Sequence, residues 1–263
     1  MKFKRNIILV AIFIIILIII LLSSIIVYYK QSYHNIDIQV ISLRHNTRLN
    51  NIYNQQRKIS KEIEIFDAVK GDQLNIDDLI ESGQIHSKYK DGGTKYKKRE
   101  IGCYLSHYSI FKQIKEQRRT DYTIVLEDDF VVVTNDLMSE TNAALDKILA
   151  EKIDFDVLFL GHINKTRNND TSNYSNGNDE YRIIDNIYKV DPDYRLIGTH
   201  AYLINNKNID KLIEATEFMN MPIDNKFKSL SKNDTLNVLL IYPTLVNQSN
   251  EIPSDIRNIK IKT

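Results

Sequence analysis

Three consecutive carboxylates, Glu127, Asp128 and Asp129, close an apolar stretch of this chain. The residues just before them, 123–126, are β-branched or apolar, which is typical of a strand buried on both faces. Adjacent acids repel one another, so a fold that holds them at the end of a central strand usually offsets them with a cation. Because ligands bind at the carboxyl edge of open α/β sheets, we expect a Mg²⁺ or Mn²⁺ site for a phosphate-bearing ligand. The alternative interpretation is a solvated acidic turn.

A cysteine and a histidine, Cys103 and His107, lie four residues apart in a stretch with helical spacing of its apolar residues, 99–117. Both side chains can bind zinc. Cys103 is the only cysteine, however, so we favour a buried thiol beside a hydrogen-bonded histidine. Gly102 and Ser106 flank the same apolar stripe, where small residues permit the close approach of another backbone or a ligand.

The elements that must position these side chains alternate between strand and helix patterns. The stretches 36–43 and 62–66 read as strands and enclose a helical pattern at 47–60, which is the opening unit of an α/β fold with parallel strands. The later pattern predicts further helices at 136–152 and 206–217 and further strands at 156–161, 181–190, 198–204 and 238–241.

The N-terminal part has the pattern of a membrane anchor. An uncharged run, 7–27, follows Lys2, Lys4 and Arg5, and at about 1.5 Å per residue it would span the roughly 30 Å core of a bilayer. Positive charge before the span predicts a cytoplasmic N-terminus and a single-pass type II protein whose remainder is lumenal or extracytoplasmic. We therefore expect a cytoplasmic tip and transmembrane signal anchor over 1–30, a short stem over 31–36 and one catalytic domain over 37–263.

Composition excludes some partners and leaves others open. Lys+Arg at 35 nearly cancels Asp+Glu at 34, so no overall basic field favours nucleic acid. A single cysteine allows no intramolecular disulfide. Nothing in the composition fixes the oligomeric state. Five glycosylation sequons are compatible with a lumenal glycoprotein; they lie at Asn164, Asn169, Asn173, Asn233 and Asn247.

Seven segments, taken in chain order, resemble glycosyltransferase family 25, which includes lipooligosaccharide galactosyltransferases and procollagen hydroxylysine galactosyltransferases. The similarity covers about residues 37–257. The segments are Ile41-Ser42-Leu43 with Arg48, Phe66 to Val69, Glu100 to His107, Leu126 to Asp129, Gly198 to Leu203, Pro222-x-Asp224, and Pro243-x-Leu245-Val246-x-Gln248.

The resemblance implies a GT-A-like fold, with a mixed, mostly parallel sheet flanked by helices. It also implies transfer of galactose or glucose from a UDP-hexose donor to a saccharide or hydroxylysine acceptor, with Mn²⁺ or Mg²⁺ as cofactor. Carried over to this chain, Asp129 is expected to bind the cation directly. Asp128 is a further metal or donor ligand, and Glu127 would contact ribose or metal-bound water.

The same resemblance suggests roles for charged residues near the first two strands. Arg44 and Arg48 are expected to meet the nucleotide, and Asp67 to accept hydrogen bonds from uracil or ribose. Arg48 has the alternative of being an exposed charge on a helix.

Two further candidates belong to the second half of the chain. If the reaction inverts the anomeric centre, a carboxylate must take the proton of the acceptor hydroxyl, and Asp224 is the candidate base. The competing interpretation of Asp224 is a helix N-cap. His200 is a candidate metal ligand or acceptor contact, or else a hydrogen-bonded histidine within the sheet.

Two other classes of function compete with a transferase. One is a catalytically inactive carbohydrate-binding member of the same fold, although binding alone needs no acidic metal cluster. The other is a metal-dependent phosphohydrolase, which would require further carboxylates or histidines at other strand ends, where Asp67 is the one candidate.

Overall fold

A computed structural model of the chain describes residues 12–23, 34–90, 95–165, 179–191 and 195–252. The chain divides into two units, Met1–His34 and Asn35–Thr263, which are considered separately. Residues 12–23 of the first unit form a helix. Within the described ranges, no helix combines the length and the apolar character needed to cross a membrane. The span expected at 7–27 extends on both sides beyond the described residues. The sequons at Asn169 and Asn173 lie outside the described residues.

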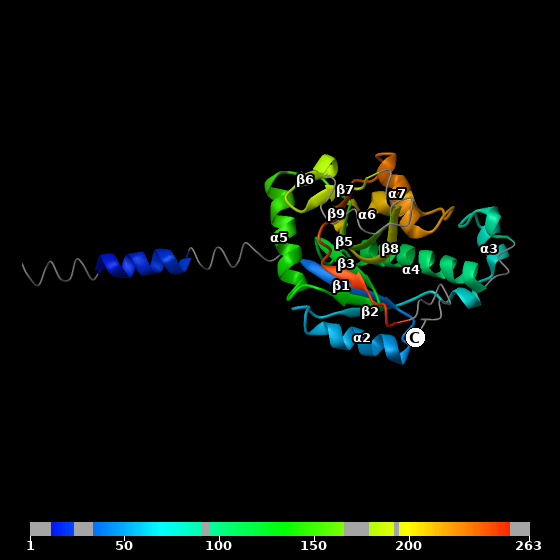
Figure 1. Ribbon diagram of the computed structural model, residues 1–263, viewed down its shortest axis with the longest axis horizontal. Helices are drawn as coiled ribbons and strands as arrows, with labels where there is room; N and C mark the ends of the chain where they lie inside the picture. The colour runs from blue at the N-terminus through cyan, green and yellow to red at the C-terminus, as the bar shows by residue number, and fades with distance from the viewer. Residues whose placement is uncertain (1–11, 24–33, 91–94, 166–178, 192–194, 253–263) are drawn as a thin grey trace, which may run out of the picture. The chain divides into compact units, whose positions relative to one another are not determined.

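The second unit is built on an eight-stranded sheet in the order β2-β1-β3-β8-β5-β9-β7-β6 (Figure 1). A separate antiparallel pair is formed by β4 and β10. The strands are β1 (Ile36–Ser42), β2 (Glu64–Asp67), β3 (Tyr122–Glu127), β4 (Phe130–Val132), β5 (Val157–Lys165), β6 (Arg182–Ile184), β7 (Ile187–Lys189), β8 (Arg195–Asn205), β9 (Val238–Ile241) and β10 (Val246–Gln248).

The large sheet is mixed, as predicted. β1 runs parallel to β2 and β3, and β5 runs parallel to β9. β8 is antiparallel to both β3 and β5, and β7 is antiparallel to both β9 and β6. Within the described sheet, only β8 and β7 therefore run against the direction of the other strands, which makes the sheet mostly parallel by strand direction.

The predicted helices are present, with shifted ends and two additions, one of them at Ile76–Glu81. The helix expected at 47–60 ends earlier, and Asp136 caps α5 by accepting a hydrogen bond from the Met138 N–H. The helix that follows Pro222 was not predicted. The helices are α2 (Asn46–Gln56), α3 (Ile76–Glu81), α4 (Lys95–Gln117), α5 (Leu137–Ala150), α6 (Ile209–Thr216) and α7 (Ile223–Lys232), with short 3-10 turns at Gly71–Gln73, Ser87–Tyr89, Asp179–Tyr181 and Asn206–Asn208.

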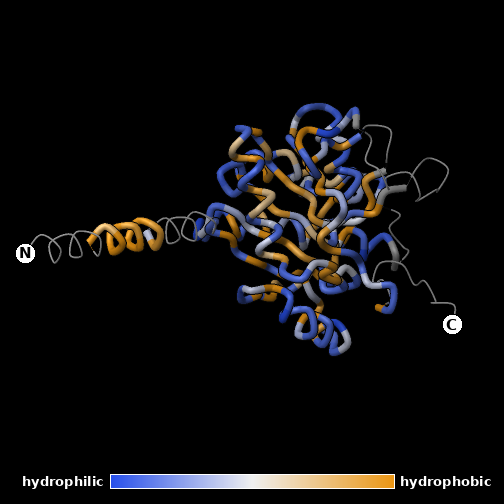
Figure 2. Tube along the Cα trace, turned by 60° about the vertical axis from the view of Figure 1, so that its left-hand side comes forward, coloured by the Kyte–Doolittle hydropathy of each residue, from blue (hydrophilic) through white to orange (hydrophobic). Residues whose placement is uncertain are grey.

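Two hydrophobic clusters cover the two faces of the sheet. Ile124 and Leu126 of β3 pack into the cluster that includes residues of α2 and α5, whereas Val125 packs into the cluster with α4, α6 and α7 (Figure 1). The hydrophobic stretches of the chain accordingly run through the strands of this unit, and hydrophilic stretches lie in the loops (Figure 2). The prediction that β3 is buried on both faces is confirmed.

Close packing of α4 fixes the wall beside the carboxyl ends of β1 and β2. A Cβ atom on Gly102 would lie 2.7 Å from the Val69 carbonyl oxygen and 2.8 Å from the Gly71 nitrogen, so only glycine fits there. Ser106 Oγ accepts a 2.8 Å hydrogen bond from the Val69 N–H and donates one of 2.7 Å to the Gly102 carbonyl. The close approach expected at these two small residues is confirmed.

Candidate active site

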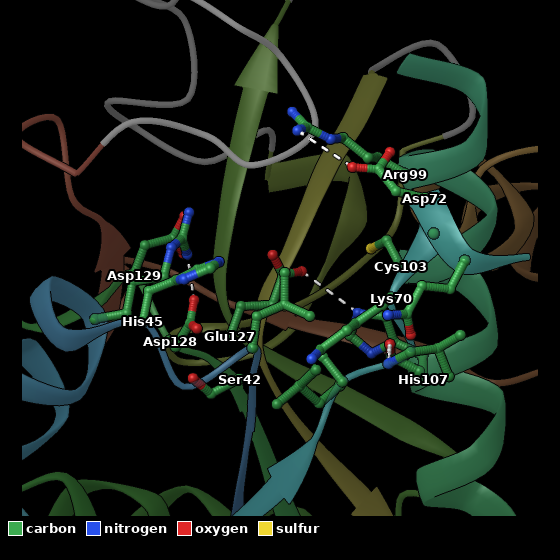
Figure 3. A pocket seen from close by; sticks show the side chains of 18 of the residues that line it. Ser42, His45, Lys70, Asp72, Arg99, Cys103, His107, Glu127, Asp128 and Asp129 are labelled. Atoms are coloured by element: carbon green, nitrogen blue, oxygen red, sulfur yellow. Dashed lines mark hydrogen bonds and ion pairs between the residues drawn. The ribbon is translucent and has the colours of Figure 1, made fainter. Parts of the chain in front are cut away.

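A cavity of about 480 Å³ lies at the sheet edge where the parallel strands β1, β2 and β3 end (Figure 3). Parallel strands carry their carboxyl ends to one edge, which is the common position of ligand sites in such sheets. The lining residues come from five segments: Ile41, Ser42, Leu43 and His45 with Arg48, 68–73, one side of α4 at Arg99, Cys103, Ser106 and His107, the acidic triplet 127–129, and Gln248.

Arg48 supplies the positive charge nearest to the acidic triplet. Its side chain is 7% exposed and forms an ion pair with Asp128, while its Nη1 lies 3.7 Å from Asp129 Oδ2. The interpretation of Arg48 as an exposed helix charge is wrong, because the first turn of α2 directs it inward against the triplet. The solvated-turn interpretation is also wrong, since Asp128 is 4% exposed and Asp129 3%.

Asp129 has an unsatisfied carboxylate oxygen. Its Oδ2 accepts a 3.0 Å hydrogen bond from the side-chain amide of Gln248, but Oδ1 is buried without a hydrogen-bond partner among the described residues. Burial, followed by the negative charge of Glu127, raises the pKa of Asp129 to about 7, although Gln248 and Arg48 act in the opposite direction. The site therefore favours a proton or a cation at Asp129.

Glu127 points away from its two acidic neighbours and toward α4 (Figure 3). Its Oε1 accepts a 2.6 Å hydrogen bond from Thr199 Oγ1 and lies 3.4 Å from His107 Nε2. Burial raises the pKa of Glu127, but the His107 imidazole and the Thr199 hydroxyl outweigh this effect and lower the pKa to about 2. Glu127 is therefore an ionised carboxylate beside an imidazole.

Arg44 and Asp67 pair with each other instead of facing the cavity. They form an exposed ion pair, with side chains 48% and 77% exposed, and neither is among the residues that line the cavity. Arg44 adopts φ +58° directly after β1, which turns its side chain toward the end of β2. Their predicted contacts with the nucleotide stay predictions.

His200 and Asp224 also lie outside the cavity lining. His200 is 1% exposed, its Nε2 lies 3.3 Å from the Val246 carbonyl oxygen, and burial lowers its pKa. Asp224 lies in the first turn of α7, where Pro222 holds the N-cap position. Its Oδ2 accepts a 3.2 Å hydrogen bond from the Gly198 N–H. The structure therefore connects Asp224 to β8, and its predicted catalytic role stays a prediction.

The lining residues Lys70 and Gln248 carried no predicted role. Lys70 and Arg99 bring positive charge to the wall formed by the loop after β2 and by α4, where Arg99 Nη2 lies 3.6 Å from Asp72 Oδ2 (Figure 3). Gln248 reaches Asp129 from β10, 119 residues further along the chain. Its place in the last family-like segment was the available signal.

Comparison with known proteins gives one family. The model of glycosyltransferase family 25, described as an LPS biosynthesis protein family, matches residues 35–227. Human procollagen galactosyltransferase 2 is 27% identical over 167 residues, which cover 62% of this chain and 25% of that protein. Procollagen galactosyltransferase 1-B of Xenopus laevis is 34% identical over 105 residues, 38% of this chain and 16% of that protein.

A third relative carries a different description. The probable inactive glycosyltransferase 25 family member 3 of Bos taurus is 32% identical over 100 residues, covering 37% of this chain and 16% of that protein. The chain thus spans a quarter or less of the length of these relatives.

Proposed function

Because the chain belongs to glycosyltransferase family 25, we propose that it transfers a hexose, galactose or glucose, from a UDP-sugar to a saccharide or hydroxylysine acceptor. The observation that carries this proposal is the buried carboxylate pair Asp128 and Asp129 beside a cavity at the carboxyl edge of the sheet. A volume of about 480 Å³ also suits a ligand of nucleotide-sugar size.

The residues at this edge fit a hard divalent cation, Mn²⁺ or Mg²⁺. Asp129 Oδ1 is buried without a hydrogen-bond partner in the described part of the chain, and carboxylate oxygens are the ligands that such cations prefer. Asp129 would hold the cation, with Asp128 beside it. When bound, the cation neutralises charge on the diphosphate of the departing UDP.

The protein's own residues supply positioning and charge balance. Arg48 keeps Asp128 in place through a buried ion pair, and Gln248 orients Asp129 by donating to its Oδ2. Lys70 and Arg99 place positive charge on another wall of the cavity, where it would attract an anionic donor. These contacts fix the acidic pair before a ligand arrives, so less ordering is required when the donor binds.

Asp224 is kept in the proposal as the acceptor base of an inverting reaction. Its Oδ2 accepts a hydrogen bond from the Gly198 N–H, and the next residue, Thr199, donates to Glu127 of the cavity lining. Two backbone N–H groups, those of Gly198 and Asn225, hold its carboxylate. These bonds would orient Asp224 for proton transfer from an acceptor hydroxyl.

The test uses the full chain and measures hydrolysis or transfer of UDP-hexoses with Mn²⁺ and with EDTA. Asp129→Ala is expected to reduce turnover by about 10²–10³-fold, the size of effect seen when one charge-stabilising group is removed from an active site. The matched control Asp77→Ala removes an exposed carboxylate of α3 and should keep full activity. Activity that survives both EDTA and Asp129→Ala would overturn the metal assignment.

A catalytically inactive carbohydrate-binding role is favoured by one observation, the similarity to a relative described as probably inactive. Calorimetry separates the two functions. A transferase should bind UDP in a manner that depends on Mn²⁺, whereas a binding protein should take up a saccharide without UDP or metal.

The location is proposed from the sequence alone. An uncharged run, 7–27, preceded by Lys2, Lys4 and Arg5, predicts a single-pass type II orientation with the catalytic unit outside the cytoplasm. In sealed microsomes, added protease should leave the unit Asn35–Thr263 intact until detergent is present. Digestion of this unit without detergent would contradict the orientation.

A further inference from the structure

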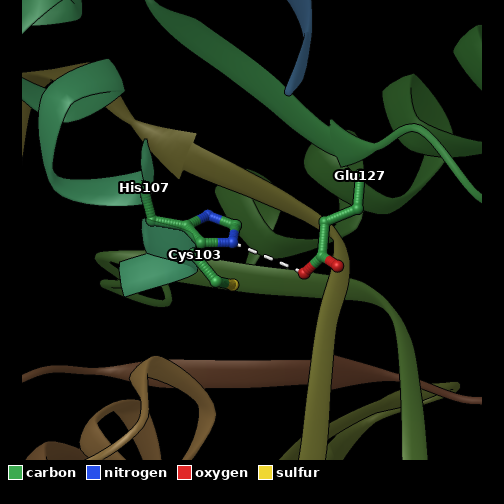
Figure 4. A group of neighbouring side chains, drawn as sticks. All are labelled: Cys103, His107 and Glu127. Carbon is green, nitrogen blue, oxygen red and sulfur yellow. Dashed lines mark ion pairs between the residues drawn. The ribbon is translucent and has the colours of Figure 1, made fainter. Parts of the chain in front are cut away.

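Cys103, His107 and Glu127 form a second cluster, in which Cys103 and His107 lie on the other side of the cavity from Asp128 and Asp129 (Figure 3). One ligand atom from each, a sulfur, a nitrogen and an oxygen, lies within 4.8 Å of the others. Cys103 and His107 are four residues apart on α4 and therefore share one face of the helix. Glu127 comes from the end of β3, and the three side chains point toward one another (Figure 4).

The spacing suits one small metal ion. His107 Nε2 and Glu127 Oε1 are 3.4 Å apart. Two ligands at the usual zinc distances of about 2.0–2.2 Å, set at a tetrahedral angle, are themselves separated by roughly 3.4 Å. The Cys103 sulfur lies within 4.8 Å of both of these atoms. All three residues line the cavity, so an ion has a route to them.

The imidazole nitrogen that faces this point is His107 Nε2, which lies beside the Glu127 carboxylate. His107 is fully buried, and its Nε2 has no hydrogen-bond partner in the described part of the chain. Its Nδ1 lies 2.7 Å from the hydroxyl oxygen of Tyr202. Histidines that bind metals commonly use one nitrogen as ligand while the other is held by a hydrogen bond, which is the arrangement found here.

The carboxylate is held in a similar way. Thr199 Oγ1 donates a 2.6 Å hydrogen bond to Glu127 Oε1, which fixes the orientation of the group toward α4. Tyr202 and Thr199 both belong to β8, so one strand positions two of the three ligands. Hydrogen bonds from residues that do not themselves bind the metal commonly orient the ligands of metal sites.

We propose that Cys103, His107 and Glu127 bind a borderline-soft divalent cation of the Zn²⁺ type, at a site separate from the Asp128 and Asp129 pair. A thiolate and an imidazole select zinc over Mg²⁺ or Mn²⁺, which prefer oxygen ligands alone. Binding replaces the thiol proton of Cys103 with the metal, and that proton passes to solvent. Three protein ligands leave one tetrahedral position open toward the cavity, as in zinc sites that also bind water or a substrate.

The first test measures metal binding and needs no donor sugar, so its failure is distinct from a failure of the proposed function. The full chain is stripped with EDTA, saturated with Mg²⁺ and titrated with Co²⁺. The expected result is one cobalt per chain, with the spectrum of a tetrahedral ion and a sulfur-to-cobalt charge-transfer band. Zn²⁺ should then abolish this spectrum. A spectrum without the charge-transfer band would overturn the proposal.

Variants locate the site. Zn²⁺ affinity, measured by competition with a chromophoric chelator, should fall by more than about 100-fold in Cys103→Ser and in His107→Gln, because loss of outer hydrogen bonds alone costs about 10–100-fold. The matched control Asp129→Ala removes a carboxylate from the other cluster and should keep the wild-type Zn²⁺ affinity. Equal Zn²⁺ affinity in the wild type and in His107→Gln would refute the site.

A measurement on the unchanged chain covers the case in which the variants do not fold. Cys103 is the only cysteine, so the rate of alkylation by iodoacetamide reports on this one thiol. Micromolar Zn²⁺ should slow alkylation at least tenfold, and the same concentration of Mn²⁺ should not. Alkylation that proceeds equally fast with and without Zn²⁺ would contradict coordination by Cys103.

Discussion

The two clusters in the cavity differ in chemistry, although three consecutive residues at the end of β3 supply carboxylates to both. Asp128 and Asp129 face Arg48 and Gln248, so that cluster consists of oxygen ligands with a built-in positive charge. Glu127 faces Cys103 and His107, so the other cluster consists of sulfur, nitrogen and oxygen. The three consecutive carboxylates therefore do not share one environment. The turn after β3 directs Glu127 away from Asp128 and Asp129 and gives them different partners.

The largest expected effect is the loss of stability when the buried ion pair is broken. Arg48→Ala leaves Asp128 and Asp129 buried without their arginine, which typically costs about 3–5 kcal/mol. Arg44→Ala breaks an exposed, solvent-screened pair at the same sheet edge and should cost far less stability. Urea denaturation of the metal-free chain measures both. Similar losses in the two variants would show that the Arg48 cluster is not buried in solution.

The next effect is a pH dependence of stability between pH 4 and 7, which arises from Asp129. The folded chain raises the pKa of Asp129 from 3.8 to about 7, so between these values the folded state holds a proton that the unfolded state has lost. This group therefore lowers the free energy of unfolding as pH rises, by up to about 1.4 kcal/mol per pH unit, and levels off above pH 7.

Asp129→Asn should remove that contribution, so the variant gains stability relative to the wild type as pH rises from 4 to 7. Asp77→Asn, on the exposed side of α3, is the control and should follow the wild type. Urea denaturation in EDTA across this pH range provides the measurement. Parallel curves for Asp129→Asn and the wild type would mean that Asp129 is ionised in the folded chain at low pH.

A smaller effect probes the other cluster through a residue that does not touch the metal. Tyr202→Phe removes the hydroxyl that holds His107 Nδ1, and Zn²⁺ affinity should fall by about 10–100-fold while Mn²⁺ affinity stays unchanged. Tyr104→Phe is the matched control, because its hydroxyl is also buried but donates to the Thr216 carbonyl. Equal Zn²⁺ affinities in the two variants would separate Tyr202 from the site.

The smallest effect concerns the wall that carries Cys103 and His107. Gly102→Ala would place a methyl group 2.7 Å from the Val69 carbonyl oxygen and force α4 away from the loop after β2. Overpacking of this kind costs about 1–3 kcal/mol. Thermal denaturation measures the loss, and Zn²⁺ affinity should weaken more than Mn²⁺ affinity because α4 carries two ligands of one cluster only. An unchanged melting temperature would show that the contact relaxes easily.

Local pattern was sufficient for most of the fold. The alternation in β1, the apolar run of β3 and the helical spacing in α4 and α5 each depend on neighbours within a few residues, so the sequence carries them directly. The helix α7 was missed because its ten residues are mostly polar and its apolar face is short. The helix is stabilised by packing of its apolar side chains against β8 and the sheet, and these contacts join residues far apart in the sequence.

The candidate site was predictable in part. The sequence placed the acids after a buried strand and left a cation site and a solvated turn open, and the structure buries Asp128 and Asp129. The inward direction of Arg48, 80 residues before Asp128, did not follow, nor did the contact of Gln248 with Asp129. Arg44 and Asp67, which the resemblance places at the nucleotide, pair with each other on the surface, and their contact with a nucleotide stays a prediction.

The sequence by itself determined most of the strands and helices, the acidic end of β3, the small residues of α4 and the family, because each depends on neighbouring residues or on the order of short segments. Only the tertiary structure decided which partner each carboxylate meets. Glu127 lies beside Cys103 and His107 because β3 and α4 pack side by side, and such contacts depend on how distant elements stack in the folded chain. For that reason Cys103 and His107, a cysteine and a histidine four residues apart in the sequence, meet the carboxylate of Glu127 only in the fold.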